Sequence, residues 1–181
     1  MKASPPCLAA WAAVLAAVPG SRLALLPAGG EPTHAYARGV LARHGLDPGR
    51  VDLLPRGPRA DYLRFFDRID VALDPFPFNG ITTTCDGLWR GVPCVSLAGD
   101  RFAGRAGVSL LTAVGLGDLV AVDVPAYVRV AAALAADRGR LTALRRALPA
   151  RAAASPLGDR PAFARKWEAA LLGMWRARAA S

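Results

Sequence analysis

The chain has 181 residues, of which 53% are apolar and 20% are charged, with 18 Gly and 15 Pro. This length predicts one domain with a core of its own, and the composition excludes a disordered chain because apolar residues are frequent and charged ones are not. The formal net charge of +9 suits anionic partners, but no run of five Lys or Arg residues occurs and no aromatic residue interrupts a basic stripe, so nucleic acid is not predicted.

The sequence contains few residues that could bind a metal or carry out thiol chemistry. Cys7, Cys85 and Cys94 are an odd number without a CxxC pair, so neither a zinc site nor a disulfide framework is predicted, and a reducing compartment, the cytoplasm, is expected. Cys85 and Cys94 fit core packing better than reactivity. His34 and His44 are the only histidines, and both are expected to be solvated. We therefore predict no metal, no cofactor and no catalytic residue within the chain.

The first 20 residues could be taken for a secretory signal, since a basic residue precedes an apolar run. Two prolines after Ser4 instead indicate the first turn of a helix, with Ser4 as its cap. Leu8, Trp11 and Leu15 recur at spacings of three or four, which favours an amphipathic helix. No apolar stretch approaches the roughly 20 residues of a membrane span, so no membrane partner is predicted.

Strands and helices are then predicted to alternate. Short apolar runs bounded by Gly, Pro or Asp indicate strands at 22–26, 51–54, 69–73, 93–97 and 119–122. Helical patterns occupy 31–45, 58–66, a stretch that starts at about 82, and 101–114. A helical tail follows from about 125 to 180, with a break near 155–158.

This alternation predicts an α/β fold, a Rossmann-like parallel sheet with flanking helices. Residues 1–155 form the predicted lobe, and residues 156–181 a C-terminal helix that closes it. All four tryptophans fall on apolar faces and are expected to pack. Ligands of such sheets bind beyond the carboxyl ends of the strands, which directs attention to the loops 26–31, 54–60, 74–82 and 97–101.

The segment 74–89 is the most informative of these. A helix begins in it just after a strand, so free backbone N–H groups at Thr82, Thr83 and Thr84 can bind an anion. Gly80 allows close backbone approach, and Asp86, one turn further on, can accept hydrogen bonds from a ribose. The alternative is that Thr82 merely caps the helix and Asp86 faces water. Three successive threonines exceed what a cap needs, which favours ligand contact without excluding the alternative.

These residues also carry a resemblance to a known family. The stretches DVALDPFPFNG, TTTCD and LWRGVPCVSL, with Gly99, Asp100 and the Arg101–Arg105 segment behind them, resemble the C-terminal catalytic lobe of the O-GlcNAc transferase family. That family includes SPINDLY-type protein O-fucosyltransferases and bacterial proteins with tetratricopeptide repeats. The likeness covers most of the chain.

The resemblance implies the C-terminal half of a GT-B glycosyltransferase, which binds a UDP-sugar, most plausibly UDP-GlcNAc, without a metal and transfers the sugar with inversion to Ser or Thr. By the same resemblance, Thr82 and Thr83 lie on the donor diphosphate and Asp86 on the ribose. Arg59 falls near the base and ribose, and Tyr62 takes the place of a histidine that stacks on uracil. The protein acceptor would be bound by an N-terminal lobe and repeats, which no part of this chain matches.

One departure from the family pattern concerns a charge. A lysine that neutralises the diphosphate typically follows the strand that matches 22–25, and Leu26 stands there, before a 27–30 segment shorter than its counterpart. Arg101 or Arg105 could supply the charge instead. Two other interpretations therefore stay open: a non-catalytic remnant that keeps the fold, and a basic interaction module whose Arg-rich tail, 139–178, binds an acidic partner.

Overall fold

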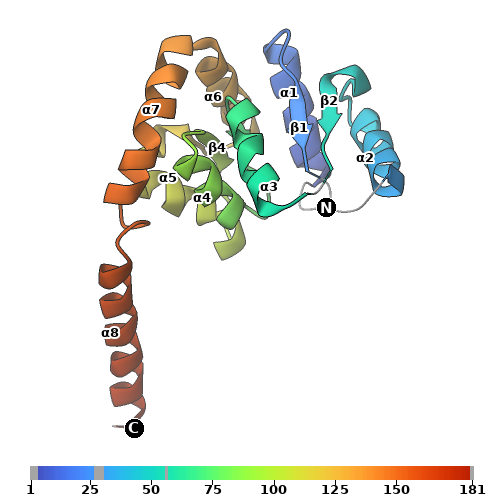
Figure 1. Ribbon diagram of the computed structural model, residues 1–181. Helices are drawn as coiled ribbons and strands as arrows, with labels where there is room; N and C mark the ends of the chain where they lie inside the picture. Colours follow the sequence, from blue (N-terminus) through green and yellow to red (C-terminus); the bar gives the residue numbers. More distant parts are fainter. Residues whose placement is uncertain (1–3, 27–30, 56, 180–181) are drawn as a thin grey trace.

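Short parallel strands alternate with longer helices in the computed structural model, which describes residues 4–26, 31–55 and 57–179 (Figure 1). The strands are β1 (Leu23–Leu25), β2 (Val51–Leu53), β3 (Ala72–Leu73), β4 (Cys94–Leu97) and β5 (Val120–Ala121). The α-helices are α1 (Pro5–Ala17), α2 (Glu31–Arg43), α3 (Arg59–Phe65), α4 (Thr82–Trp89), α5 (Ala106–Ala113), α6 (Val124–Ala136), α7 (Arg138–Ala154) and α8 (Arg160–Ala179). Short 3-10 helices are η1 (Pro48–Arg50), η2 (Phe66–Arg68), η3 (Phe102–Gly104) and η4 (Gly117–Leu119).

Local sequence explains where the helices begin and end. The helices α1, α6 and α7 each follow a residue whose side-chain oxygen accepts a backbone N–H of the first turn: Ser4, Asp123 and Asp137. Gly91 lies just beyond α4 with φ +79°, and a Cβ there would lie 2.3 Å from the carbonyl oxygen of Arg145 in α7. Only glycine fits this turn, which allows α4 to pack against α7.

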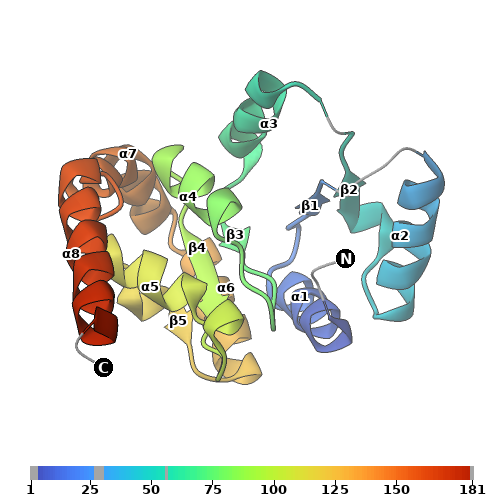
Figure 2. The same ribbon diagram turned by 90° about the horizontal axis from the view of Figure 1, so that it is seen from below.

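The predicted parallel sheet is present in two parts. One part pairs β1 with β2, with Leu23 opposite Val51, and the other has the order β3-β4-β5. All of these pairs are parallel, and helices lie on both sides of the strands (Figure 2). The predicted fold class is confirmed, but the described residues contain no hydrogen-bonded pairing between β1 and β3.

One hydrophobic core joins the two parts. Leu88, Val95 and Leu111 are fully buried in it, and α1 packs on α6 across its edge. The buried Tyr127 hydroxyl donates to the carbonyl of Asp74 at 3.1 Å and accepts from the Trp11 indole at 3.2 Å. This chain of bonds connects α1 and α6 to the loop that follows β3 and so fixes the position of that loop.

The tail forms the predicted helix, but in this structure α8 does not close the lobe. It has no buried residue and extends away from the other elements (Figure 1). Only Trp11 among the tryptophans packs as predicted, at 5% exposed, whereas Trp89 is 40%, Trp167 57% and Trp175 67% exposed. An apolar helical stripe does not reveal whether a partner surface for it lies within the same chain. The division of the chain at residue 155 stays a prediction.

Candidate functional site

The start of α4 is an uncapped helix N-terminus at the carboxyl edge of the strands. Ile81 occupies the N-cap position with φ −113° and ψ −74° and makes no side-chain capping bond. The first turn of α4 contains no acidic residue, so its positive end is not neutralised locally. Thr82 and Thr83 are exposed on this turn. Thr82 is therefore not a cap, and the backbone N–H groups here are suited to an anion.

Asp86 lies one turn further along α4 and faces α3. Its side chain is only 14% exposed, and its Oδ1 atom lies 3.2 Å from Nη2 of Arg59, whose side chain is 68% exposed. Asp86 consequently does not simply face water. Arg59 is the first residue of α3, so the fold brings together two predicted site residues that are 27 positions apart in the sequence.

Tyr62 joins the same group from the middle of α3. Its half-buried ring packs edge-on against Phe66, with ring centroids 5.4 Å apart. Burial raises the pKa of Tyr62, while a hydrogen bond with Thr83 lowers it and the Asp86 carboxylate raises it. We call the group formed by Arg59, Tyr62, Thr83 and Asp86 the α3–α4 cluster. It places a cation, an aromatic ring, a hydroxyl and a carboxylate, in that order of residues, beside the uncapped start of α4.

The structure corrects the interpretation of Thr84 and Gly80 as ligand contacts. Thr84 is 5% exposed, and its hydroxyl donates to the Gly80 carbonyl at 3.1 Å. Gly80 is buried and donates its own N–H to Asp74 Oδ1 at 2.7 Å. A Cβ on Gly80 would lie 2.9 Å from the Thr84 hydroxyl, so packing of the loop, and not approach to a ligand, requires glycine at this position.

Sequence reasoning missed the buried polar network that holds this loop. The Asp74 carboxylate is 2% exposed and accepts from the Ser96 hydroxyl at 2.6 Å as well as from Gly80. Asn79 is fully buried; its amide donates to the Pro75 carbonyl, and its side-chain oxygen accepts the Gly107 N–H at 3.2 Å. A serine within the apolar strand β4 was the available signal, because buried polar side chains need partners.

A second loop, between β4 and α5, is tied to the first. The Asn79 N–H donates to the Ala103 carbonyl at 2.9 Å, and the Gly99 N–H to the Gly104 carbonyl at 2.8 Å. Arg105, one of the two candidate substitutes for the lysine, donates to the Gly99 carbonyl at 3.1 Å, and Arg101 is exposed. These bonds hold both loops at the carboxyl edge before any ligand arrives.

Leu26, the departure from the family pattern, directly follows β1 and is half-buried. The segment 27–30 lies outside the described residues. The end of β1 therefore presents an apolar side chain at the position where the resemblance implies a cation.

Other sequence candidates lie away from this site or inside the core. His34, predicted to be solvated, is 7% exposed because α2 turns it inward, beside Glu31. Cys94 is buried as predicted, and burial raises its pKa well above the usual range. Within the described ranges, no His, Cys, Asp and Glu side chains gather in a group of three or more that could hold a metal ion. No described helix is both long and apolar enough to cross a membrane.

Residues 1–166 match the model of glycosyl transferase family 41. The chain is 44% identical over 178 residues to a protein of Oryza sativa subsp. japonica and 42% to one of Arabidopsis thaliana, each described as a probable UDP-N-acetylglucosamine–peptide N-acetylglucosaminyltransferase SPINDLY. Each alignment covers 97% of this chain, but only 19% and 20% of the relatives, so the chain spans about a fifth of their length.

A solved structure agrees with these sequence relatives. A lysine-to-methionine mutant of the Thermobaculum terrenum O-GlcNAc transferase is 36% identical and superimposes with a TM-score of 0.91, over 99% of this chain and 35% of that one. A family match over most of the chain, relatives above 40% identity and a shared fold point to the same conclusion. The chain belongs to glycosyl transferase family 41 and is part of its catalytic region.

Proposed function

We propose that this chain is the nucleotide-sugar-binding lobe of a protein O-glycosyltransferase, with UDP-GlcNAc as the donor. The observation that carries the proposal is the α3–α4 cluster beside the uncapped start of α4. The names of the relatives, which specify UDP-N-acetylglucosamine and a peptide acceptor, support it. Because the chain spans about a fifth of those relatives, transfer to Ser or Thr is proposed for an assembly that contains further polypeptide, including an acceptor lobe.

Each part of the cluster has a task in this proposal. The N–H groups and hydroxyls of Thr82 and Thr83 hold the diphosphate, and the helix dipole favours its negative charge. Asp86 accepts hydrogen bonds from the ribose hydroxyls in place of, or together with, its bond from Arg59. The Tyr62 ring is a stacking surface for the base. Charge on the departing UDP is stabilised by fixed donors, so the proposed transfer requires no metal.

Calorimetric titration of the full chain with UDP tests the proposal. We expect the wild type to give a saturable heat signal that Asp86→Ala abolishes. Asp118→Ala is the control, because Asp118 is also an aspartate paired with an arginine, Arg140. Asp118 is more exposed than Asp86 and lies in η4, just before β5 and so at the opposite ends of the strands. No response to UDP, or an equal response from both variants, would refute the assignment.

GDP belongs in the same experiment. The resemblance includes SPINDLY-type fucosyltransferases, and the rice and Arabidopsis relatives described above are both SPINDLY proteins by name. A response to GDP alone would transfer the donor assignment to a guanosine diphosphate sugar while leaving the site residues as proposed.

Leu26 favours a second candidate, a non-catalytic remnant that keeps the fold. An apolar residue at the end of β1 gives no charge to a diphosphate, whereas a lysine there would contribute a charge-assisted contact. If the lobe retains a nucleotide site, Leu26→Lys should tighten UDP binding. If neither the wild type nor Leu26→Lys binds UDP, the remnant is the better description.

A further inference from the structure

Helices α3 and α4 meet through two pairs of side chains. Arg59 and Tyr62 lie three residues apart on α3, and Thr83 and Asp86 lie three residues apart on α4, so each pair shares one face of its helix. Arg59 Nη2 lies 3.2 Å from Asp86 Oδ1, and the Tyr62 hydroxyl is hydrogen-bonded to both Thr83 and Asp86. The Asp86 carboxylate is therefore held by two residues of α3.

These contacts matter for the position of α3, because α3 has no buried residue of its own. A firm anchor follows the helix: Phe66 is 3% exposed and packs against the edge of the Tyr62 ring, with ring centroids 5.4 Å apart. Tyr62 therefore links this buried anchor to α4. Its ring fixes where the side chain lies, and its hydroxyl reaches Asp86.

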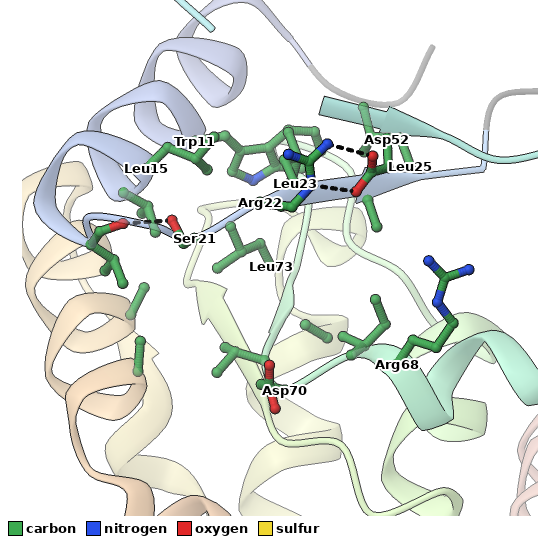
Figure 3. A pocket seen from close by; sticks show the side chains of 18 of the residues that line it. Trp11, Leu15, Ser21, Arg22, Leu23, Leu25, Asp52, Arg68, Asp70 and Leu73 are labelled. Carbon is green, nitrogen blue, oxygen red and sulfur yellow. Dashed lines mark hydrogen bonds and ion pairs between the residues drawn. The ribbon is translucent and has the colours of Figure 1, made fainter. Parts of the chain in front are cut away.

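A nearby hollow does not use the same side chains. It has a volume of about 720 Å³, lies between β1 and β3 (Figure 3), and includes Phe66 and Thr83 in its lining. Arg59, Tyr62 and Asp86 are not among the described residues that line it. The Arg59 side chain is instead 68% exposed. The polar side of the α3–α4 cluster therefore opens to solvent, where a nucleotide can approach Asp86.

The Asp86 carboxylate has room for a ribose beside these partners. An ionised carboxylate only accepts hydrogen bonds, and it does so at about four lone-pair sites. Arg59 and Tyr62 donate to two of these sites, so about two remain, which is what the two vicinal hydroxyls of a ribose require. A carboxylate that is already oriented by two donors loses less side-chain freedom when a ligand binds.

Given the nucleotide site of the proposed function, on which this step rests, we propose that Arg59 and Tyr62 are positioning residues: they hold Asp86 in the orientation that selects a ribonucleotide over its deoxy analogue. The resemblance implies a stacking ring at Tyr62 and a place near the base and ribose for Arg59, but no action of either through Asp86. Without these donors the carboxylate would turn more freely, and a ribose would have to order it at a cost in affinity. Only the ribose part of the affinity should therefore depend on the two residues.

Binding of UDP and of 2′,3′-dideoxy-UDP to the full chain tests the proposal. The two ligands share the base and the diphosphate and differ only in the hydroxyls that Asp86 would bind. Ligand-observed NMR titration suits the comparison, because it measures binding that is too weak for calorimetry. Hydrogen bonds to a charged group are stronger than neutral ones, so we expect the wild type to bind UDP at least about tenfold more tightly than the dideoxy analogue.

Two substitutions remove the donors one at a time. Arg59→Met keeps the apolar stem of the side chain and removes its charge, and Tyr62→Phe keeps the ring and its packing on Phe66 and removes the hydroxyl. Each should weaken UDP binding about three- to tenfold and change the affinity for the dideoxy analogue by less than about twofold. Arg64→Met is the matched control, because Arg64 is also on α3 and 70% exposed but is paired with Asp61. It should change neither affinity.

An Asp86→Asn background separates action through Asp86 from direct contact with the ligand. There, Arg59→Met and Tyr62→Phe should have no further effect on UDP affinity, because the carboxylate that they position is gone. A loss that persists in this background would mean that the two side chains contact the nucleotide themselves, and it would overturn the proposal.

The remaining outcomes separate this proposal from the proposed function. The positioning role is also overturned if the variants weaken UDP and the dideoxy analogue equally, or if neither variant weakens UDP; either variant suffices if the other does not fold. If the wild type binds both ligands equally, the nucleotide site stands, but its selectivity for ribose and the positioning role are refuted. If the wild type binds neither ligand, the proposed function itself fails.

Discussion

Ser96→Ala isolates the buried hydrogen bond that holds the loop leading into α4. The Ser96 hydroxyl donates to Asp74 Oδ2 at 2.6 Å, with Ser96 fully buried and Asp74 2% exposed. The substitution removes one oxygen atom and the donor, and adds no volume that could strain the core. The Asp74 carboxylate keeps its bond from the Gly80 N–H, so the loop is weakened without losing all its support.

The expected magnitude follows from burial. Removing one partner of a buried hydrogen bond typically costs about 1–3 kcal/mol, so we take about 2 kcal/mol for the loss in free energy of unfolding. For a chain of this length that loss corresponds to a thermal midpoint lower by about 4–8 °C. UDP binding should also weaken, since Asp74 fixes Gly80 and through it the start of α4.

Urea unfolding followed by circular dichroism measures the loss, with Ser109→Ala as the matched control. Ser109 is exposed, and its hydroxyl is 3.5 Å from the Arg105 carbonyl, so its loss should cost under about 0.5 kcal/mol. In an Asp74→Ala background the cost of Ser96→Ala should shrink, because the bond is already gone. The reasoning is refuted if the two serine variants are equally stable, or if the Ser96 cost is unchanged without Asp74.

Three further predictions concern other parts of the fold. Gly91→Ala should prevent cooperative folding, as judged by circular dichroism, because φ is +79° and the new Cβ would lie 2.3 Å from the Arg145 carbonyl oxygen; Gly173→Ala, in open space, is the control. Removal of residues 160–181 should change the thermal midpoint by no more than about 2 °C, because α8 has no buried residue; a larger drop would mean that α8 does stabilise the lobe. Burial raises the pKa of Cys7 from 9.0 to about 11, so the native state holds this proton when the unfolded chain loses it, and stability should fall as pH rises from 9.0 to about 11. Urea unfolding across that range should show a shallower fall in Cys7→Ala, and equal slopes in the two proteins would contradict the shift.

The sequence alone was sufficient for the order and type of the strands and helices as far as about residue 125, since their signals are local. In the helical tail it predicted the break near 155–158 but missed the one at Asp137, which separates α6 from α7. Ser4 and the two prolines after it predicted the start of α1, and apolar runs near 22–26 and 93–97 predicted β1 and β4 within two residues of their bounds. The family resemblance was equally accessible, because contiguous motifs such as LWRGVPCVSL carry it. Periodicity, capping and turn residues need no knowledge of distant contacts, so these predictions agree with the structure.

The tertiary structure decided which side chains meet and which are covered. Thr84 belongs to the same run as Thr82 and Thr83, but successive side chains of a helix point about 100° apart, so Thr84 points in a different direction from its neighbours. That direction is buried only because the loop before α4 lies there, which the local sequence does not show. The apolar stripe of α8 resembles in sequence the stripe of a packed helix. Packing also needs a partner surface, however, and α8 has no buried residue. The separation of β1 from β3 was likewise not predictable, because local patterns specify strands and only long-range contacts specify which strands pair.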